Sequence, residues 1–132
     1  MQNSKKSVTP RVRVIQKLYG NSLNPDADIE YPKSQYKKFI KDVVQGTIER
    51  NDLIVETIKN YIPDDLDLKR TDKLLKIIIF AAIFELMYKH NSPTKVIISE
   101  YVKTSEFFLE NAQIKFVNAI LDKISKSIRK PL

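Results

Sequence analysis

The chain has few residues that could do catalytic chemistry. Two carboxylates, Glu85 and Glu100, lie among apolar neighbours in the sequence. A carboxyl group in such surroundings can serve as a general acid, but a hydrogen bond or an ion pair inside the core is its simpler use. The single histidine, His90, follows the expected end of a helix, where a positive charge is favourable without any bound ligand.

Other reactive groups are also scarce. The sequence has no cysteine, which excludes disulfides, thiol nucleophiles and thiolate metal sites. With only two glycines and one histidine, it offers no glycine-rich phosphate loop and no familiar catalytic triad. We therefore expect a protein that is not an enzyme and that uses neither a cofactor nor a metal.

The basic residues suggest a different chemistry, the binding of a polyanion. The net charge of the 132 residues is +7, but residues 1–19 alone carry +5 and residues 111–132 carry +4, whereas residues 20–110 carry −2. The basic residues of the first segment are Lys5, Lys6, Arg11, Arg13 and Lys17. If the fold brings the two ends together, they form one basic surface suited to nucleic acid. The alternative is a lysine-rich composition that serves solubility only.

Length and composition predict one folded domain over residues 1–132, with residues 1–9 as a basic, flexible arm. The hydrophobic fraction of 42% and the charged fraction of 30% are typical of globular proteins. The longest wholly apolar run, residues 77–84, is too short to span a bilayer, and residues 1–20 lack the apolar core of a signal peptide. We expect a cytoplasmic protein that makes no membrane contact.

The apolar residues recur at intervals of three and four, which predicts an all-α protein. The expected helices cover about 10–20, 34–50, 52–61, 72–88, 93–109 and 112–128, with a polar connection at 21–33. Only Lys76 and Glu85 are charged between Leu74 and Tyr88, so this helix should be the centre of a bundle.

The first and last helices carry the candidate binding residues. Arg11 projects on the buried face of the first helix, where it either pairs with a carboxylate such as Glu85 or grips phosphate. Arg13 and Lys17 face water. Two binding classes follow: an RNA-binding module in which Tyr19 or Phe116 offers a stacking surface, or a helical protein interaction module whose basic ends serve solubility.

On the last helix, the apolar stripe leaves Lys115 on the surface, in a separate stripe with Asp122, Lys126 and Arg129. Asn118 lies on the border, where we expect its side chain to hydrogen bond to the neighbouring helix. Phe116 lies away from the stripe, so it either packs on a second neighbour or is available to a partner.

Four stretches resemble a known family when taken in order. KFVNAILDKI, residues 115–124, resembles the KFVNGVLDK signature of the bacterial NusB family. RVRVIQKLY (11–19), RTDKLLKIIIFAAIFEL (70–86) and SPTKVIISEYV (92–102) resemble three further family motifs. The resemblance covers most of the chain apart from the loop near 21–33.

The resemblance implies a compact bundle of about six to seven helices in two packed subdomains and a non-enzymatic role in transcription antitermination. Members of the family bind the boxA element of ribosomal RNA transcripts together with the ribosomal protein NusE, within an elongation complex that contains RNA polymerase. We expect a monomer or a homodimer, and the sequence does not distinguish the two.

The resemblance also suggests individual contacts. Residues that match motif positions and are expected to contact RNA are Arg11, Gln16, Tyr19, Lys115 and Asn118, whereas Lys5, Lys6 and Arg13 fit by charge and location. Phe116 and Glu85 are the expected contacts with a protein partner. The chain departs from the family pattern at Ala119 in place of glycine, Ser99 in place of asparagine and Phe80 in place of arginine.

Overall fold

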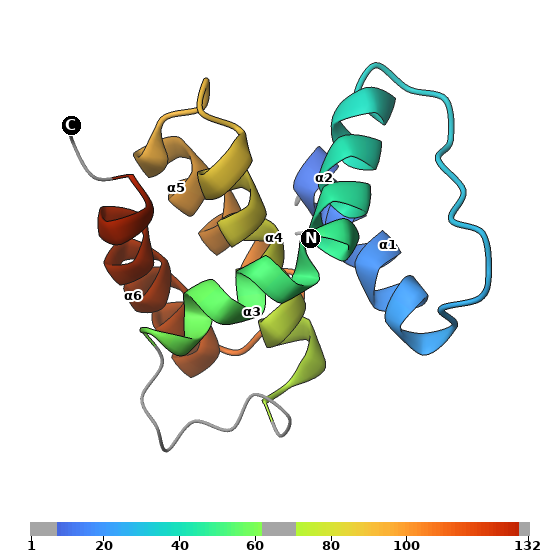
Figure 1. The fold of residues 1–132 in the computed structure, drawn as a ribbon. Coiled ribbons are helices and arrows are strands. Elements are labelled where there is room, and N and C mark those ends of the chain that lie inside the picture. The colour runs from blue at the N-terminus through green and yellow to red at the C-terminus, as the bar shows by residue number, and fades with distance from the viewer. Residues whose placement is uncertain (1–7, 62–70, 130–132) are drawn as a thin grey trace.

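The computed structural model describes residues 8–61 and 71–129, and these ranges contain six α-helices (Figure 1). The helices are α1 (Pro10–Leu23), α2 (Lys37–Glu49), α3 (Asn51–Lys59), α4 (Lys73–Tyr88), α5 (Thr94–Ser105) and α6 (Asn111–Ile128). The all-α prediction is confirmed, and each expected helix is present.

The arrangement is organised around α4, which packs against α1, α2, α3, α5 and α6. Every residue from Ile78 to Leu86 is buried, as expected for a helix that is apolar nearly all round. Figure 1 shows α1 and α2 on one side of α4 and α5 and α6 on the other, in agreement with two packed groups of helices. The sequence prediction of a central helix is therefore confirmed.

Two helix ends differ from the predictions. Helix α1 continues through Gly20 to Leu23, because Gly20 keeps a helical backbone and has no positive φ. Helix α5 ends at Ser105, short of the expected Leu109. The N–H groups of Glu106, Phe107 and Phe108 bond to carbonyl oxygens three residues earlier, so the chain tightens into turns before α6 begins.

Side chains cap three of the helices. Thr9 accepts a hydrogen bond from the Val12 N–H at 3.3 Å ahead of Pro10, which confirms the predicted start of α1. At α4 the cap is Asp72, which accepts from the Leu75 N–H at 3.0 Å, whereas the sequence suggested Thr71. Glu110 and Gln113 form a reciprocal capping box at the start of α6.

One close approach fixes α2 against α4. Gly46 of α2 faces the ring of Phe84, and a Cβ atom built at Gly46 would collide with three atoms of that ring. The missing side chain therefore allows the Phe84 ring to pack directly on the α2 backbone.

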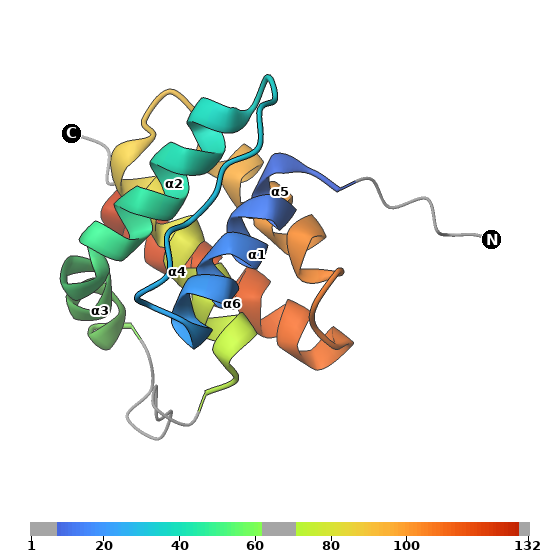
Figure 2. The ribbon, with the colours of Figure 1, turned by 90° about the vertical axis from the view of Figure 1, so that its right-hand side faces the viewer.

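The connection between α1 and α2 runs alongside both helices (Figure 2). Ile29 and Tyr31 in this connection are half-buried and pack against the core. The Gln45 side chain of α2 donates a hydrogen bond to the Tyr31 hydroxyl at 2.8 Å. These contacts hold the last part of the connection against α2 and the core.

Parts of the sequence predictions lie outside the described residues. Lys5, Lys6 and most of the expected arm at 1–9 belong to residues 1–7, and the proline and acidic run after Tyr61 belong to residues 62–70. Within the described ranges, no helix has both the length and the apolar character needed to cross a bilayer.

Candidate nucleic-acid interface

Helix α1 separates a buried face from a polar one. Val12, Val14, Ile15 and Leu18 are buried in the core. Arg13 and Gln16 are exposed and Lys17 is half-buried, so these three side chains form the polar face of the helix. The predicted outward direction of Arg13 and Lys17 agrees with this arrangement, and Gln16 lies between them.

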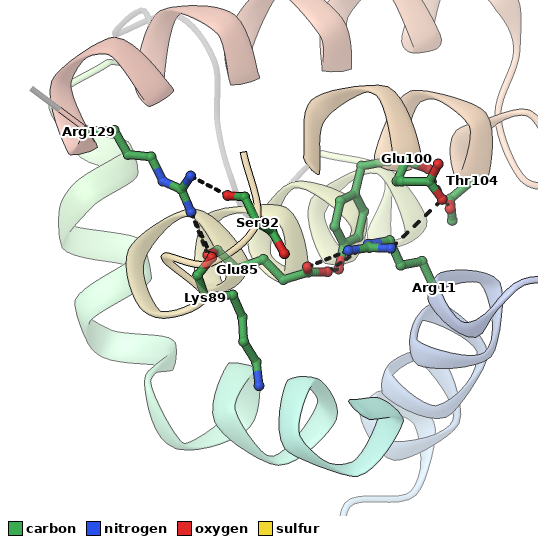
Figure 3. Close-up of polar contacts among 8 residues, drawn as sticks. Arg11, Glu85, Lys89, Ser92, Glu100, Thr104 and Arg129 are labelled. Carbon is green, nitrogen blue, oxygen red and sulfur yellow. Dashed lines mark hydrogen bonds and ion pairs between the residues drawn. The ribbon is translucent and has the colours of Figure 1, made fainter. Parts of the chain in front are cut away.

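Arg11 points away from that polar face and toward α4. Its Nε and Nη2 atoms donate to the two carboxylate oxygens of Glu85 at 2.9 and 2.7 Å, and the Glu85 side chain has no exposed surface (Figure 3). The Nη1 atom also lies 3.8 Å from a carboxylate oxygen of Glu100. Of the two alternatives for Arg11, the structure shows the internal ion pair.

Aromatic rings complete the surroundings of Arg11. Its guanidinium carbon lies 4.9 Å from the centre of the Phe39 ring and 5.6 Å from that of Tyr101. Burial acts to lower the pKa of Arg11, but the hydrogen bond and the negative charge of Glu85 outweigh it, and this pKa is raised. The arginine is therefore a permanent cation that joins α1 to α4 and α5.

Tyr101 shares the same carboxylate. Its hydroxyl donates a hydrogen bond to Oε2 of Glu85, and the residue is fully buried in α5. Burial, together with the negative charge of Glu85, raises the pKa of Tyr101 well above its usual value. The phenol consequently stays protonated and acts as a hydrogen-bond donor in the core.

Burial changes the interpretation of Glu85, which the resemblance suggested as a partner contact. The carboxylate is enclosed and already bonded to Arg11 and Tyr101, so no part of this side chain is available at the surface. Phe116, the other expected partner contact, is half-buried and packs against the core. This is the packing alternative that the sequence left open for Phe116. Tyr19 is likewise half-buried.

Helix α6 presents Lys115 and Asn118 to solvent. Asn118 lines a shallow groove with Ser99 and Lys103 of α5, but its side chain makes no hydrogen bond with another described residue. The expected bond between Asn118 and the neighbouring helix is therefore wrong. Lys115 lines a separate hollow at the start of α6, with Glu106 and Leu109.

Arg129 does not belong to the solvent-facing stripe to which the sequence assigned it. Its guanidinium donates to the carbonyl oxygens of Leu86, Ser92 and Lys89 at 3.0, 2.5 and 3.0 Å (Figure 3). These carbonyls belong to the end of α4 and the turn that follows it. Arg129 therefore satisfies the free acceptors of a helix C-terminus and holds the end of α6 beside that turn.

The two basic ends of the sequence do not merge into one surface over the described residues. Helices α1 and α6 lie on opposite sides of α4 in Figure 1, and the groove that contains Arg13 and Gln16 has no residue of α6. Arg11 and Arg129, which contributed to the charge of these ends, form internal contacts.

A basic groove beside α1 was missed by the sequence prediction. It has a volume of about 360 Å³ and is lined by Arg13, Gln16 and Lys17 of α1 together with Tyr31, Lys33 and Lys37. Residues 33–41 contain Lys33, Lys37, Lys38 and Lys41 and no acidic residue. This local excess of positive charge could have indicated the groove from the sequence. Averaging the charge over residues 20–110 concealed that cluster.

Histidine, cysteine and carboxylate side chains do not gather in the described parts of the chain. No group of three or more histidine, cysteine or carboxylate side chains there is arranged to hold a metal ion. The polar surfaces of α1 and α6 instead present lysine, arginine and amide groups, which donate hydrogen bonds to phosphate and to bases.

Comparison with known sequences places these features in a family. The model of the NusB family matches residues 6–126 of the chain. A transcription antitermination protein NusB from Mesorhizobium japonicum is 35% identical over 92 residues, which are 70% of this chain and 59% of that protein. One from Allorhizobium ampelinum is 29% identical over 120 residues, which are 91% of this chain and 75% of that protein.

The fold also has a solved counterpart. The structure of T. maritima NusB superimposes with a TM-score of 0.77, covers 89% of each chain and is 23% identical in sequence. At that level of identity the likeness shows a shared fold.

Proposed function

Because this chain belongs to the NusB family, we propose that it is an RNA-binding transcription antitermination factor. The family is one of non-enzymatic factors, and the sequence contains no recognisable catalytic motif. More specifically, we propose that residues 1–132 form one cytoplasmic domain that binds the boxA RNA of ribosomal RNA transcripts together with NusE. This binding would take place within the elongation complex of RNA polymerase.

The observation that carries the RNA half of this proposal is the polar face of α1. Arg13 and Gln16 are exposed, Lys17 lies beside them, and neither Arg13 nor Lys17 forms an ion pair with another described residue. Unpaired cations on a rigid helix offer phosphate contacts without first breaking an internal bond. Lys115 and Asn118 are exposed and remain proposed RNA contacts, as do Lys5 and Lys6.

The internal network supports this role indirectly. Arg11 fixes the first turn of α1 against α4 and α5, so the neighbouring Arg13 is presented from a held helix. We assign Arg11 to positioning this helix, and Arg13 to phosphate contact.

Fluorescence anisotropy of a labelled boxA RNA and a scrambled RNA, with and without NusE, tests the proposal. We expect a preference for boxA that becomes stronger when NusE is added. Equal binding of the two RNAs without any effect of NusE would refute the boxA and NusE assignments. That outcome would favour a helical interaction module whose charges serve solubility.

A further inference from the structure

We propose that the basic groove between α1 and residues 31–37 holds the phosphate backbone of a single RNA strand. This inference rests on the proposed function and extends the RNA-binding surface beyond α1, to Lys33 and Lys37. Neither lysine lies in a stretch that resembles a family motif.

Charge is the first argument. Four cations line the groove, namely Arg13 and Lys17 from α1, Lys33 from the connection and Lys37 from the first turn of α2. No acidic residue is among the described residues that line it. Cations from three separate segments converge there without a carboxylate to neutralise them, so their repulsion is relieved by an anion.

The walls of the groove are held in place. Tyr31 is half-buried and its hydroxyl is bonded to Gln45 of α2, while Ile40 packs against the core behind it. On the other wall, the Arg11–Glu85 ion pair ties α1 to α4. The lysine side chains can move, but the backbones that carry them are fixed, so binding need not order these segments.

The start of α2 adds to the positive potential. Lys37 occupies the first turn, which contains no acidic residue, and the cap residue Tyr36 makes no side-chain hydrogen bond to it, whereas the adjacent Lys38 pairs with Asp42 one turn later. Cations at the positive end of a helix dipole are unfavourable for the isolated protein. A phosphate bound beside Ser34 and Lys37 would turn this arrangement into a favourable one.

The charges of the neighbouring surface indicate at which end the RNA strand leaves the basic groove. A second groove shares Gln16 and Lys17 with the first but continues toward Asn24, and there Asp28 and Glu30 line it. Two carboxylates repel a phosphate backbone, so the strand is expected to leave the basic groove past Arg13. This end of α1 is the one that follows the basic residues Lys5 and Lys6 in the sequence.

Salt-dependent binding of an unstructured RNA oligonucleotide tests the groove directly. The test variant is Lys33→Gln with Lys37→Gln, and the control is Lys41→Gln with Lys123→Gln, two exposed lysines outside the groove. Both variants lose the same charge. Each single-strand phosphate contact adds about 0.7 to the slope of log affinity against log salt, so the loss of two contacts should lower the slope by about 1.4.

The outcomes separate the two proposals. We expect the test variant to bind about tenfold more weakly at roughly 0.1 M salt, and the control to keep the slope of the unmodified protein. Equal slopes for the two variants would overturn the groove assignment while leaving RNA binding by the protein intact. If the unmodified protein binds no RNA, the proposed function itself fails. Binding of a polyglutamate peptide in the groove in preference to RNA would also overturn the inference.

Discussion

Arg11 on α1 and Glu85 on α4 form a two-pronged ion pair across the core, with N–O distances of 2.9 and 2.7 Å to a carboxylate that has no exposed surface. Arg13, which lies two residues further along the helix, is exposed to solvent. The two arginines of this turn of α1 therefore differ in environment, since Arg11 is bound within the fold and Arg13 is exposed at the surface.

Replacing each arginine by alanine should have different effects. Arg11→Ala leaves the buried Glu85 charge without its main partner, so the free energy of unfolding should fall by about 3 kcal/mol or more. Arg13→Ala should change stability by less than about 0.5 kcal/mol, because the side chain is exposed, yet it should weaken RNA binding. Urea denaturation and RNA titration of both variants provide the measurement. A stable Arg11→Ala protein with lost RNA binding would reverse the two assignments.

Stability should depend on Tyr101 at high pH. The pKa of this tyrosine is raised in the folded protein, mainly because it is buried, so the phenol binds its proton more tightly in the folded than in the unfolded state. The resulting stabilisation is complete below about pH 10, the usual pKa of tyrosine, and declines as the pH rises through the raised folded-state value.

Tyr101→Phe provides the comparison for this pH dependence. At pH 8 the variant should be less stable by about 1.5 to 3 kcal/mol, since a hydrogen bond to a charged group is lost. Between about pH 10 and 11 the difference should narrow by up to roughly 1.4 kcal/mol per pH unit. Other titrating groups change the stability of both proteins alike, so their contributions cancel in the stability difference. A constant difference would show that the Tyr101 proton does not contribute.

The two glycines should respond in opposite ways to alanine. At Gly46 the new methyl group would meet the Phe84 ring, so we expect Gly46→Ala to cost about 1 to 3 kcal/mol. Gly20 lies inside α1 with no atom within 4 Å of an added Cβ, so Gly20→Ala should add about 0.5 to 1 kcal/mol. Thermal unfolding measures both. Equal effects would mean that the Phe84 ring can move aside freely.

Arg129→Met should destabilise the junction of α4 and α6. The substitution removes donors to the carbonyls of Leu86, Lys89 and Ser92 while keeping much of the side-chain volume, so we expect a loss of about 1.5 to 3 kcal/mol. Lys126→Met, at an exposed position of the same helix, is the control. Similar stability of the two variants would argue against a structural role for Arg129.

The helices could be predicted because their apolar spacing is a local property of the sequence. All six appear within a few residues of the expected ranges, and the run around Phe80 to Phe84 correctly indicated a central helix. The end of α1 was harder to place. Glycine permits a helix to stop but does not require it, and Gly20 stays helical.

The polar contacts were less predictable because they join residues far apart in the sequence. Glu85 could be named as a partner for Arg11, but choosing between that carboxylate and phosphate required the packing of α1 on α4. Arg129 binds carbonyls about 40 residues away, as its contact with Lys89 shows, and helical periodicity carries no signal for that. Lys33 and Lys37 were overlooked because acidic residues elsewhere masked their local charge.

We expect RNA to bind on the polar face of α1. This assignment can be checked by photocrosslinking a thiouridine-substituted boxA RNA to the protein in the presence of NusE and identifying the crosslinked peptides by mass spectrometry. We expect crosslinks within residues 13–37, including peptides that contain Gln16 or Tyr31, and we expect these crosslinks to be lost when scrambled RNA is used. Specific crosslinks confined to other parts of the chain, such as α3, would contradict it.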